Sequence, residues 1–363
     1  MTENLSYATA GVDVEAGERA VELMRSAISK ASRPEVFGDF GGFAGLFDVS
    51  ALKKFNRPLL ATSTDGVGTK IDVARRMDVH DTVGIDLVAM VVDDLVVCGA
   101  EPLFMTDYIA VGKVHPERVA AIVTGIATGC ATAGCALVGG ETAEHPGLLG
   151  DEDYDIAGAG TGIVDADKLL GPDRVQIGDV AIAVASSGLH SNGYSLARHI
   201  AFNVLKRDVH DHIDEFGRTL GEELLEPTRI YSLDFLALIS DVDVHSISHI
   251  TGGGVAANVA RVLPESASLK IDRSTWNPQP IFNYLVAGGN VAQHEAEKTF
   301  NMGIGMLVIV AAADADKAIA KLAGRGLLAW ECGTIAQRES GEMGDAVAKG
   351  GNGGAVSLVG AHR

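Results

Sequence analysis

Apolar runs that end in glycine-rich loops recur along this chain and constrain its fold more than any other feature. The run "PLLA" leads into "STDGVGTK", "CALV" leads into "GGETAE", and "VAIAVA" leads into "SSGLHSNG". Between these runs lie segments with helical apolar spacing, such as residues 13–31 and 117–134. Strands that alternate with helices in this way predict a mixed α/β architecture.

The length of 363 residues exceeds the usual size of one domain. Residues 165–179, "DADKLLGPDRVQIGD", are polar and turn-rich, and the strand–loop–helix pattern starts again after them. We therefore predict two α/β domains, residues 1–170 and 171–363. Within the second, "DVHSISHITGGG" is expected to be a loop that opens a helix. The segment "ESGEMGDAVAKGGNGG" predicts a flexible loop, and the closing "AVSLVG" predicts an edge strand.

The charge of the chain limits its partners. There are 29 Lys and Arg residues against 48 Asp and Glu residues, so the formal net charge is −19. Nucleic acids and anionic membranes both need clustered Lys and Arg, and no such cluster occurs. If the ligand is itself an anion, we expect Mg²⁺ to mediate its binding, because carboxylates can hold a phosphate through the metal.

The location of the protein is predicted from three further features. The four cysteines form no CxxC pair and are expected to be buried structural thiols in a reducing cytoplasm. The amino-terminal "MTENLSYATAG" lacks the basic and apolar regions of a signal peptide. The most apolar segment, "VGIDLVAMVVDDLVVCGA", contains three acids, which excludes an ordinary transmembrane span. We expect a soluble cytoplasmic protein.

The loop "ATSTDGVGTKID" is the first candidate site. It fails the Walker A template, because Gly66 and Gly68 are two residues apart and Ile71 follows Lys70. A dinucleotide fingerprint fails at Ile71 as well. What remains is Asp65 at a strand end, a glycine backbone that can form an anion nest, and a lysine. A hairpin turn with a solvated lysine is the alternative.

Carboxylates provide the second candidate. At 100° per residue, Asp86 and Asp93 lie about 20° apart on one helix, and Asp94 lies about 80° from Asp86. Acids on so apolar a helix predict either caps and salt bridges or metal ligation. Glu141 follows two glycines at a strand end. Asp65, Asp94 and Glu141 together would suit Mg²⁺, with phosphates completing the shell.

Two loops of the second half have the composition of anion sites at helix starts. In "SSGLHSNGYS", His190 stands among hydroxyls and glycines, followed by Ser191 and Asn192. His190 is either a structural residue or a proton carrier. In "HITGGGVAANVA", Thr251 precedes three glycines, which again suits a phosphate.

Seven motifs that occur in order resemble one family, the phosphoribosylformylglycinamidine cyclo-ligases, also called aminoimidazole ribonucleotide (AIR) synthetases, and the likeness runs from about Tyr7 to Ile335. The tail after residue 339 departs from the family pattern. The motifs are "STDGVGTK", "GIDLVAMVVDDLVVCGAEPLF", "LVGGETAEHPG", "DEDYDIAG", "SSGLHSNGYSLAR", "EPTRIY" and "HITGGGVAANVARVLP".

The resemblance implies an ATP-dependent ring closure in purine biosynthesis, in which formylglycinamidine ribonucleotide (FGAM) becomes AIR with release of ADP and phosphate. It implies two α/β domains of mixed sheets and a homodimer in which the N-terminal strands of two chains form a shared barrel. ATP and Mg²⁺ would bind in the N-terminal domain, and the C-terminal loops would lie at the substrate side.

The resemblance also assigns residues, each an expectation at this point. His190, Lys70 and Asp94 are expected to be catalytic. The family pattern selects Asp94, whereas helical spacing alone would pick Asp86 with Asp93. The remaining assignments are Asp65, Gly66, Gly68, Thr69 and Lys70 for ATP phosphates, Ser191, Asn192, Thr251, Gly252 and Gly253 for the substrate, and Asp65, Asp94 and Glu141 for the metal.

Other readings of the same architecture remain. Selenophosphate synthetases need a reactive cysteine near the N-terminus, and the first cysteine here is Cys98. Formylglycinamidine synthetase and thiamin-monophosphate kinase fit the "SSGLHSNGYS" and "HPGL" segments less well. A non-catalytic nucleotide-binding partner is the alternative from another class.

Overall fold

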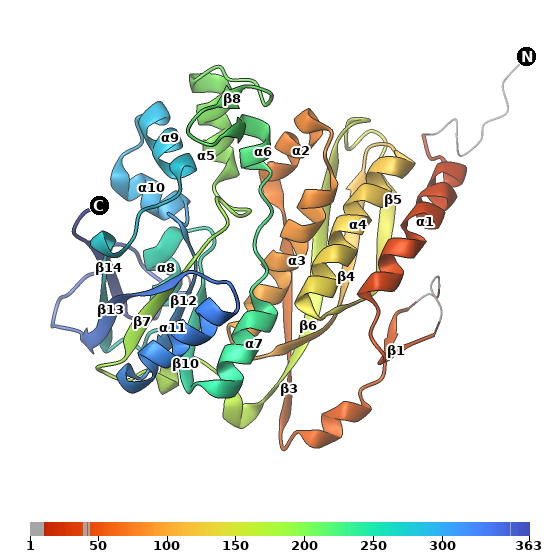
Figure 1. The fold of residues 1–363 in the computed structure, drawn as a ribbon. Coiled ribbons are helices and arrows are strands. Elements are labelled where there is room, and N and C mark those ends of the chain that lie inside the picture. The colour runs from red at the N-terminus through yellow and green to blue at the C-terminus, as the bar shows by residue number, and fades with distance from the viewer. Residues whose placement is uncertain (1–10, 39–41, 43, 349) are drawn as a thin grey trace, which may run out of the picture. The chain divides into compact units, whose positions relative to one another are not determined.

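The computed structural model describes residues 11–38, 42, 44–348 and 350–363. The signal-peptide prediction concerns the amino-terminal segment "MTENLSYATAG". Residues 1–10 of that segment lie outside the described residues. The chain forms two compact units, which are described one at a time. The first comprises Met1–Leu95 and Glu101–Asp165, and the second comprises Val96–Ala100 and Ala166–Arg363. Figure 1 labels their elements.

The first unit is built on a sheet in the order β3-β6-β4-β5. β4 and β5 are parallel, and β6 is antiparallel to both β3 and β4. The carboxyl ends of β3, β4 and β5 therefore lie at the same edge. The strands are β3 (Pro58–Gly66), β4 (Glu101–Val111), β5 (Ala136–Glu144) and β6 (Tyr154–Asp165), with a separate pair of β1 (Val36–Phe37) and β2 (Leu46–Phe47).

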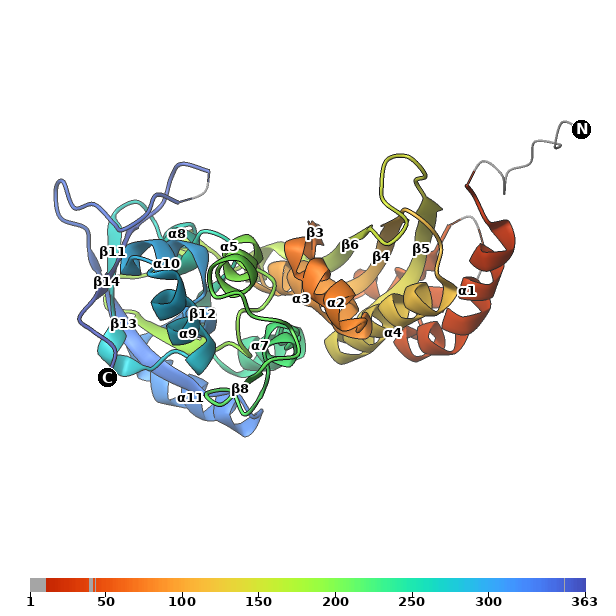
Figure 2. The same ribbon diagram turned by 90° about the horizontal axis from the view of Figure 1, so that it is seen from above.

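Helices cover one face of this sheet, as Figures 1 and 2 show. Gly158 and Gly160 of β6 lie directly against Leu87 and Val91 of α3, so the absent side chains let the helix approach the strands. The opposite face stays open, and Leu60 on it is 66% exposed. The helical segments are α1 (Val14–Ile28), η2 (Ser29–Ala31), η3 (Ser50–Lys54), η4 (Gly68–Lys70), α2 (Ile71–Met77), α3 (Asp81–Val96) and α4 (Pro116–Ala133).

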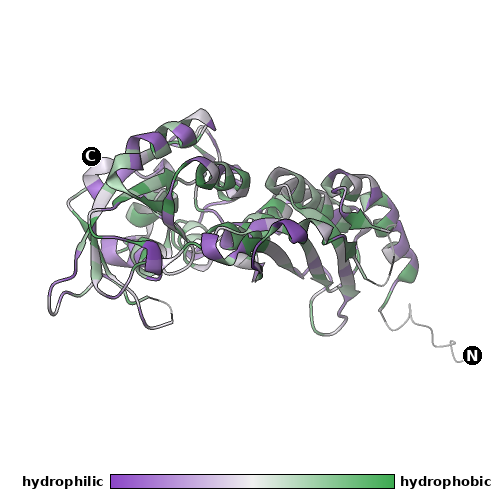
Figure 3. Cartoon of the chain, turned by 90° about the horizontal axis from the view of Figure 1, so that it is seen from below, coloured by the Kyte–Doolittle hydropathy of each residue, from purple (hydrophilic) through white to green (hydrophobic). Residues whose placement is uncertain are grey.

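Helix α1 is amphipathic, as the predicted spacing requires. Asp13 caps it by accepting a hydrogen bond from the Ala16 N–H, and Ala20, Met24 and Ala27 are buried. Leu23 of the same helix is 44% exposed. Figure 3 shows hydrophilic and hydrophobic bands along this helix, the one nearest the N-terminus.

Helices α3 and α4 touch through two glycines. A Cβ on Gly125 would lie 1.8 Å from the Asp81 carbonyl oxygen, and one on Gly84 would lie 2.3 Å from the Ile122 carbonyl oxygen. The backbones therefore meet with no side chain between them. Both glycines are required by this close approach.

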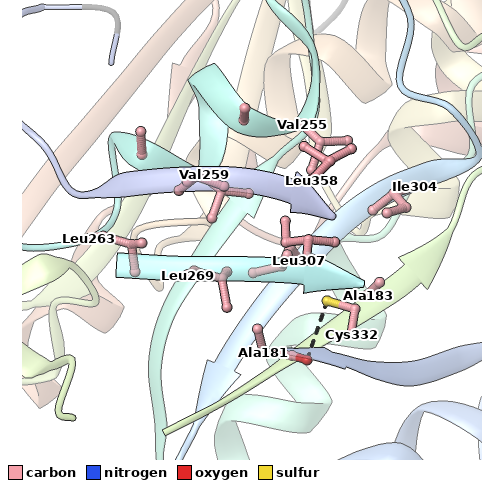
Figure 4. Packing of buried hydrophobic residues seen from close by; sticks show 14 of the residues in the cluster. Ala181, Ala183, Val255, Val259, Leu263, Leu269, Ile304, Leu307, Cys332 and Leu358 are labelled. Carbon is pink, nitrogen blue, oxygen red and sulfur yellow. Dashed lines mark hydrogen bonds between the residues drawn. The ribbon is translucent and has the colours of Figure 1, made fainter. Parts of the chain in front are cut away.

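The second unit contains a sheet in the order β10-β12-β7-β13-β11-β14. Every residue of β10 and of β12 is buried. Figure 4 shows part of the apolar core, where the Cys332 thiol donates to the Ala181 carbonyl oxygen at 3.4 Å. The strands are β7 (Val180–Ala185), β10 (Val244–His249), β11 (Ala267–Asp272), β12 (Ile304–Val310), β13 (Ala329–Gln337) and β14 (Ala355–Val359), beside a separate pair of β8 (His212–Ile213) and β9 (Arg218–Thr219).

Short helices surround this sheet. They are η5 (Ala166–Lys168), η6 (Pro172–Arg174), α5 (Tyr194–Arg198), the π-helix η7 (His199–Val204), α6 (Leu220–Leu224), α7 (Ser232–Asp241), α8 (Gly254–Ala260), η8 (Arg273–Thr275), α9 (Pro280–Gly289), α10 (Gln293–Thr299), η9 (Ala312–Asp314) and α11 (Ala315–Gly324).

The mixed α/β class predicted from the sequence is confirmed, and β14 is the predicted edge strand. One local expectation is wrong. Residues 244–249 form the fully buried strand β10, because a buried strand lacks the polar alternation that would reveal it. The glycine-rich tail is a loop in its described residues, as predicted, and it packs at two points: Ala348 is buried, and a Cβ on Gly353 would lie 2.1 Å from the Ala260 carbonyl oxygen.

The cysteine prediction holds for three of the four thiols. Cys130, Cys135 and Cys332 are buried, Cys98 is partly exposed, and all four are free. Among the described residues no helix is long and apolar enough to cross a membrane.

We expect Gly125→Ala to lower the free energy of unfolding by about 3 kcal/mol, because the added methyl group overlaps backbone atoms of α3. Gly17→Ala is the matched control. Nothing lies within 4 Å of its added carbon, so alanine should stabilise α1 by up to ~1 kcal/mol. Urea unfolding of both variants measures the difference. Equal stabilities would contradict the close helix contact.

Candidate functional site

The first glycine loop turns β3 into α2. Asp65 accepts a hydrogen bond from the Gly66 N–H at 2.7 Å, and Val67 is buried. Gly68 has φ of +71° with open space around it, so glycine serves the left-handed backbone there. Gly68 and Thr69 are exposed. The loop therefore presents backbone at the carboxyl edge of the sheet.

Lys70 is fully buried in this loop. Its ammonium lies 2.9 Å from Oδ1 and 2.8 Å from Oδ2 of Asp86 on α3, and both side chains are 0% exposed. Of the two alternatives for Asp86, the structure therefore supports the salt bridge. A solvated lysine in a hairpin turn is excluded. Contact between Lys70 and a phosphate would require the ammonium to be shared with Asp86.

The three acids expected at a metal occupy separate positions. Asp94 is exposed on α3, while Asp93 beside it is buried. Asp65 on β3 pairs with Gly158 on β6. Glu141 on β5 pairs with Tyr108 on β4, at the adjacent register position of the sheet.

Adjacent rows point to opposite faces, so Asp65 and Glu141 lie on opposite faces of the sheet. They are three strands apart, about 14 Å. In the described part of the chain, no group of three His, Cys, Asp or Glu side chains is placed to hold a metal ion. The expected three-acid cluster is thus not assembled within one described chain.

In the second unit, the loop after β7 is held by its neighbours. Asn301 Nδ2 donates to the Gly188 carbonyl oxygen at 2.9 Å, and Ser187 Oγ donates to the Pro227 carbonyl oxygen at 2.7 Å. The Arg229 N–H in turn donates to Ser187 Oγ at 3.1 Å. The "EPTRIY" segment therefore fixes the start of this loop.

His190 lies inside this loop and is 1% exposed. Its φ of +61° is left-handed, and its Nε2 accepts a hydrogen bond from the Ser187 N–H at 3.2 Å. This bond places the ring proton on Nδ1. The ring packs beside Tyr231, and a Cβ on Gly305 would lie 2.8 Å from His190 Cε1. The geometry gives His190 a structural task; proton transfer by it stays a prediction.

The two predicted substrate loops meet. Asn192 Oδ1 accepts a hydrogen bond from the Gly252 N–H at 3.0 Å. On the other side of the glycine loop, the buried Asn258 donates to the carbonyl oxygens of Gly254 at 2.8 Å and of Thr251 at 3.1 Å. A cavity of about 500 Å³ opens beside Gly253. The structure thus brings Asn192 against the loop of Thr251, Gly252 and Gly253, and of these residues Gly253 lines the cavity.

The cavity beside Gly253 has a mixed lining. Arg273 forms a bidentate ion pair with Glu297, with N···O distances of 2.7 and 2.8 Å. Gln293, His294, Lys298 and Asp345 also contribute polar groups to its lining. A polar ligand with both donors and acceptors fits this lining.

Two residues of these sites were not predicted. Asn258 stands in the apolar run "VAANVA", where a helix-disfavouring amide was the available signal. Asp107 stands at an inward position of β4, between the buried Met105 and Ile109. Burial raises the pKa of the Asp107 carboxyl to about 7.

Two family models match the chain. The AIR synthase related protein N-terminal domain matches residues 48–164, and the corresponding C-terminal domain matches residues 176–345. The chain is 49% identical to the phosphoribosylformylglycinamidine cyclo-ligase of Brevibacillus brevis, over 91% of this chain and 95% of that protein. It is 48% identical to that of Trichlorobacter lovleyi, over 91% and 94%.

Solved structures share the fold at lower identity. Thiamine-monophosphate kinase from Stenotrophomonas maltophilia aligns with a TM-score of 0.64 at 18% identity, over 93% of this chain and 95% of that one. The hydrogenase maturation protein HypE in complex with ATP aligns with a TM-score of 0.62 at 16% identity, over 88% and 86%.

We expect Asp86→Ala to lower the free energy of unfolding by about 3 kcal/mol, because it leaves the Lys70 charge buried without its carboxylate. The double variant Lys70→Met, Asp86→Leu should recover most of the loss. Arg19→Ala, which removes an exposed ion pair with Glu117, should change stability by less than ~0.5 kcal/mol. Denaturant unfolding checks all three, and a loss below 1 kcal/mol for Asp86→Ala would contradict the buried pair.

Proposed function

We propose a function from the premise that this chain belongs to the phosphoribosylformylglycinamidine cyclo-ligase family. It closes the imidazole ring of FGAM with ATP, giving AIR, ADP and phosphate in purine biosynthesis. The observation that carries this conclusion is identity of 48–49% with cyclo-ligases over 91% of the chain, including both family domains. The enzyme is a ligase that forms a C–N bond.

The reaction has two chemical parts. The formyl oxygen of FGAM attacks the γ-phosphorus of ATP, and ADP leaves. The amidine nitrogen then attacks the formyl carbon, the C–O bond breaks, and phosphate leaves with the electron pair. Phosphorylation turns a poor leaving oxygen into a good one, so positioning and charge neutralisation carry the catalysis.

The first loop is our candidate for the ATP phosphates. Gly66, Gly68 and Thr69 supply backbone and a hydroxyl at the carboxyl edge, and Gly68 and Thr69 are exposed. Lys70 is held by Asp86 and would act as an oriented charge beneath the loop.

Carboxylate and phosphate oxygens are the hard ligands that suit Mg²⁺, so we propose that the metal binds together with the nucleotide. We assign Asp65 and Asp94 to the metal-bound nucleotide, with Asp94 also the catalytic acid of the family pattern. Glu141 is a separate contact, because the sheet register keeps it on the face opposite to Asp65. When bound, Mg²⁺ would supply charge neutralisation of the polyphosphate.

The substrate is assigned to the second unit. The two loops offer Ser191, Asn192, Thr251, Gly252 and Gly253 as candidate hydrogen-bonding groups, and Gly253 lines the cavity. His190 supports the loop that carries Ser191 and Asn192, because its buried ring packs inside that loop. Its proposed role in proton transfer requires the Ser187 contact to open.

The open face of the first sheet supports a homodimer. Strand β3 alternates between exposed and half-buried residues from Pro58 to Asp65, and Leu60 and Tyr108 are large exposed groups on that face. A second copy would cover them, in the manner the family resemblance implies. Sedimentation velocity of the pure protein tests this, and a monomer at micromolar concentration would count against it. We place the enzyme in the cytoplasm, where its nucleotide substrates are made.

We expect the purified protein to convert FGAM to AIR only with Mg-ATP, releasing one ADP per AIR. Excess EDTA should abolish both activity and nucleotide binding, because a chain of charge −19 repels free polyphosphate. Absence of AIR would overturn the assignment. ADP release without FGAM, or with thiamin monophosphate instead, would favour a different kinase-like member, and nucleotide binding without turnover would favour a non-catalytic partner.

We expect Asn192→Ala to raise the KM for FGAM about tenfold while the KM for ATP stays within twofold, because the lost bond to Gly252 loosens only the substrate loops. Asn203→Ala, an exposed asparagine of η7, is the matched control and should change neither constant. Equal increases in both KM values would contradict the division of the sites.

A further inference from the structure

The last turn of α10 lies directly against both loops that we assign to the substrate. Gly193 ends the first of these loops, and Gly254 directly follows the second. A Cβ on Gly254 would lie 1.7 Å from the Glu297 carbonyl oxygen. A Cβ on Gly193 would lie 2.9 Å from the Thr299 carbonyl oxygen and 2.6 Å from Cδ1 of Phe300. Both loops therefore rest on one short stretch of backbone at the end of α10.

The backbone conformations of the two glycines permit this contact. Gly193 has φ of +77° and Gly254 has φ of +73°, a left-handed conformation that other residues rarely adopt. No side chain separates either loop from α10, and a close-packed interior has little space to absorb a displacement. A shift of α10 would therefore move both loops. The position of this helix sets where Asn192 meets the Gly252 N–H.

An ion pair fixes the same end of α10. Arg273 of η8 donates to the Glu297 carboxylate through Nε at 2.7 Å and through Nη2 at 2.8 Å, and the two side chains are 11% and 8% exposed. Gln293 Nε2 also donates to Glu297 Oε1, at 2.9 Å. A bidentate arginine–carboxylate pair adds geometric specificity to its charge. The pair therefore holds the last turn of α10 in a defined orientation.

The remaining nitrogen of Arg273 binds the C-terminal strand. Its Nη1 donates to the Leu358 carbonyl oxygen of β14 at 2.6 Å and to the Gly360 carbonyl oxygen at 3.2 Å. Each of the three guanidinium nitrogens thus already donates to the protein. An arginine occupied in this way is suited to holding other residues in place and not to binding an anionic ligand.

We propose that Arg273 is a positioning residue for the substrate loops, an inference that rests on the proposed function. Through the Glu297 carboxylate it fixes the last turn of α10, and that turn fixes the loops of Asn192 and Gly252 relative to each other. Arg273 and Glu297 also line the cavity beside Gly253, so the pair borders the space next to these loops. Its contribution is to substrate affinity and not to the chemical step.

The test is Arg273→Met, which keeps most of the side-chain length and removes the ion pair. We expect the KM for FGAM to rise about fivefold, because loops without a fixed separation bind the substrate less well. The KM for ATP and kcat should stay within about twofold, since the loop proposed for ATP belongs to the other unit. Both proteins are assayed where denaturant unfolding shows them to be fully folded, so a loss of stability alone does not move these constants.

A second measurement needs no substrate. The bond from the Gly252 N–H to Asn192 should open more often in Arg273→Met, so peptides covering residues 186–193 and 250–254 should exchange amide hydrogen about tenfold faster. Peptides from β12, in which every residue is buried, should exchange at the wild-type rate. This local pattern distinguishes positioning from a general loss of stability.

Arg174→Met is the matched control. Arg174 donates to Asp243 at 2.5 Å, directly before the start of β10, whereas the Thr251 loop follows the end of that strand. The control therefore removes an arginine–carboxylate pair at the opposite end of the same strand. It should change neither the KM for FGAM nor the exchange of the two loops.

Three results would overturn the proposal. The first is a folded Arg273→Met with an unchanged KM for FGAM and unchanged loop exchange. The second is faster exchange confined to residues 355–360, because Arg273 would then only anchor β14. The third is faster exchange throughout the second unit, because the role of Arg273 would then be structural alone.

If Arg273→Met does not fold, Arg273→Lys repeats the test. Lysine keeps the charge without the two parallel bonds, so it should show the same changes to a smaller degree. A wild type that makes no AIR overturns the proposed function. The exchange measurement still decides in that case whether Arg273 positions the two loops.

Discussion

The buried pair of Lys70 and Asp86 is the interaction on which the first unit depends. It joins the loop after β3 to the middle of α3, and both charges are fully removed from water. A buried pair of this kind is costly to break and fixes one arrangement of the groups it joins. The exposed backbone of Gly68 and Thr69 is presented at the sheet edge because the residue that follows them is anchored beneath.

The second unit fixes its loops with amides instead of charges. Asn192 and Asn258 bind opposite sides of the same glycine loop, and Asn301 and Ser187 hold the loop that carries His190. Amides satisfy the buried backbone groups of these loops without adding charge. The glycines can then keep backbone conformations that other residues rarely adopt, as at Gly253 with φ of +103°.

The net charge of −19 is compatible with a phosphate-handling enzyme if a cation mediates nucleotide binding, as proposed above. In the proposed function, carboxylates would bind the cation, the cation would bind the polyphosphate, and the glycine backbone would orient it.

The sequence by itself determined the mixed α/β class, the positions of most strands and helices, and the loops that carry the site. The spacing of apolar residues and the positions of glycines are local properties of the sequence. They can therefore be read from segments such as "STDGVGTK" and "SSGLHSNG" without a structure. Only the tertiary structure decided what each side chain meets. Spacing put Asp86 and Asp93 on one helix face, but not Lys70 against Asp86. The register of four strands separated Asp65 from Glu141 and aligned Asp65 with Asp107, because which face a strand residue points to depends on partners far away in the chain.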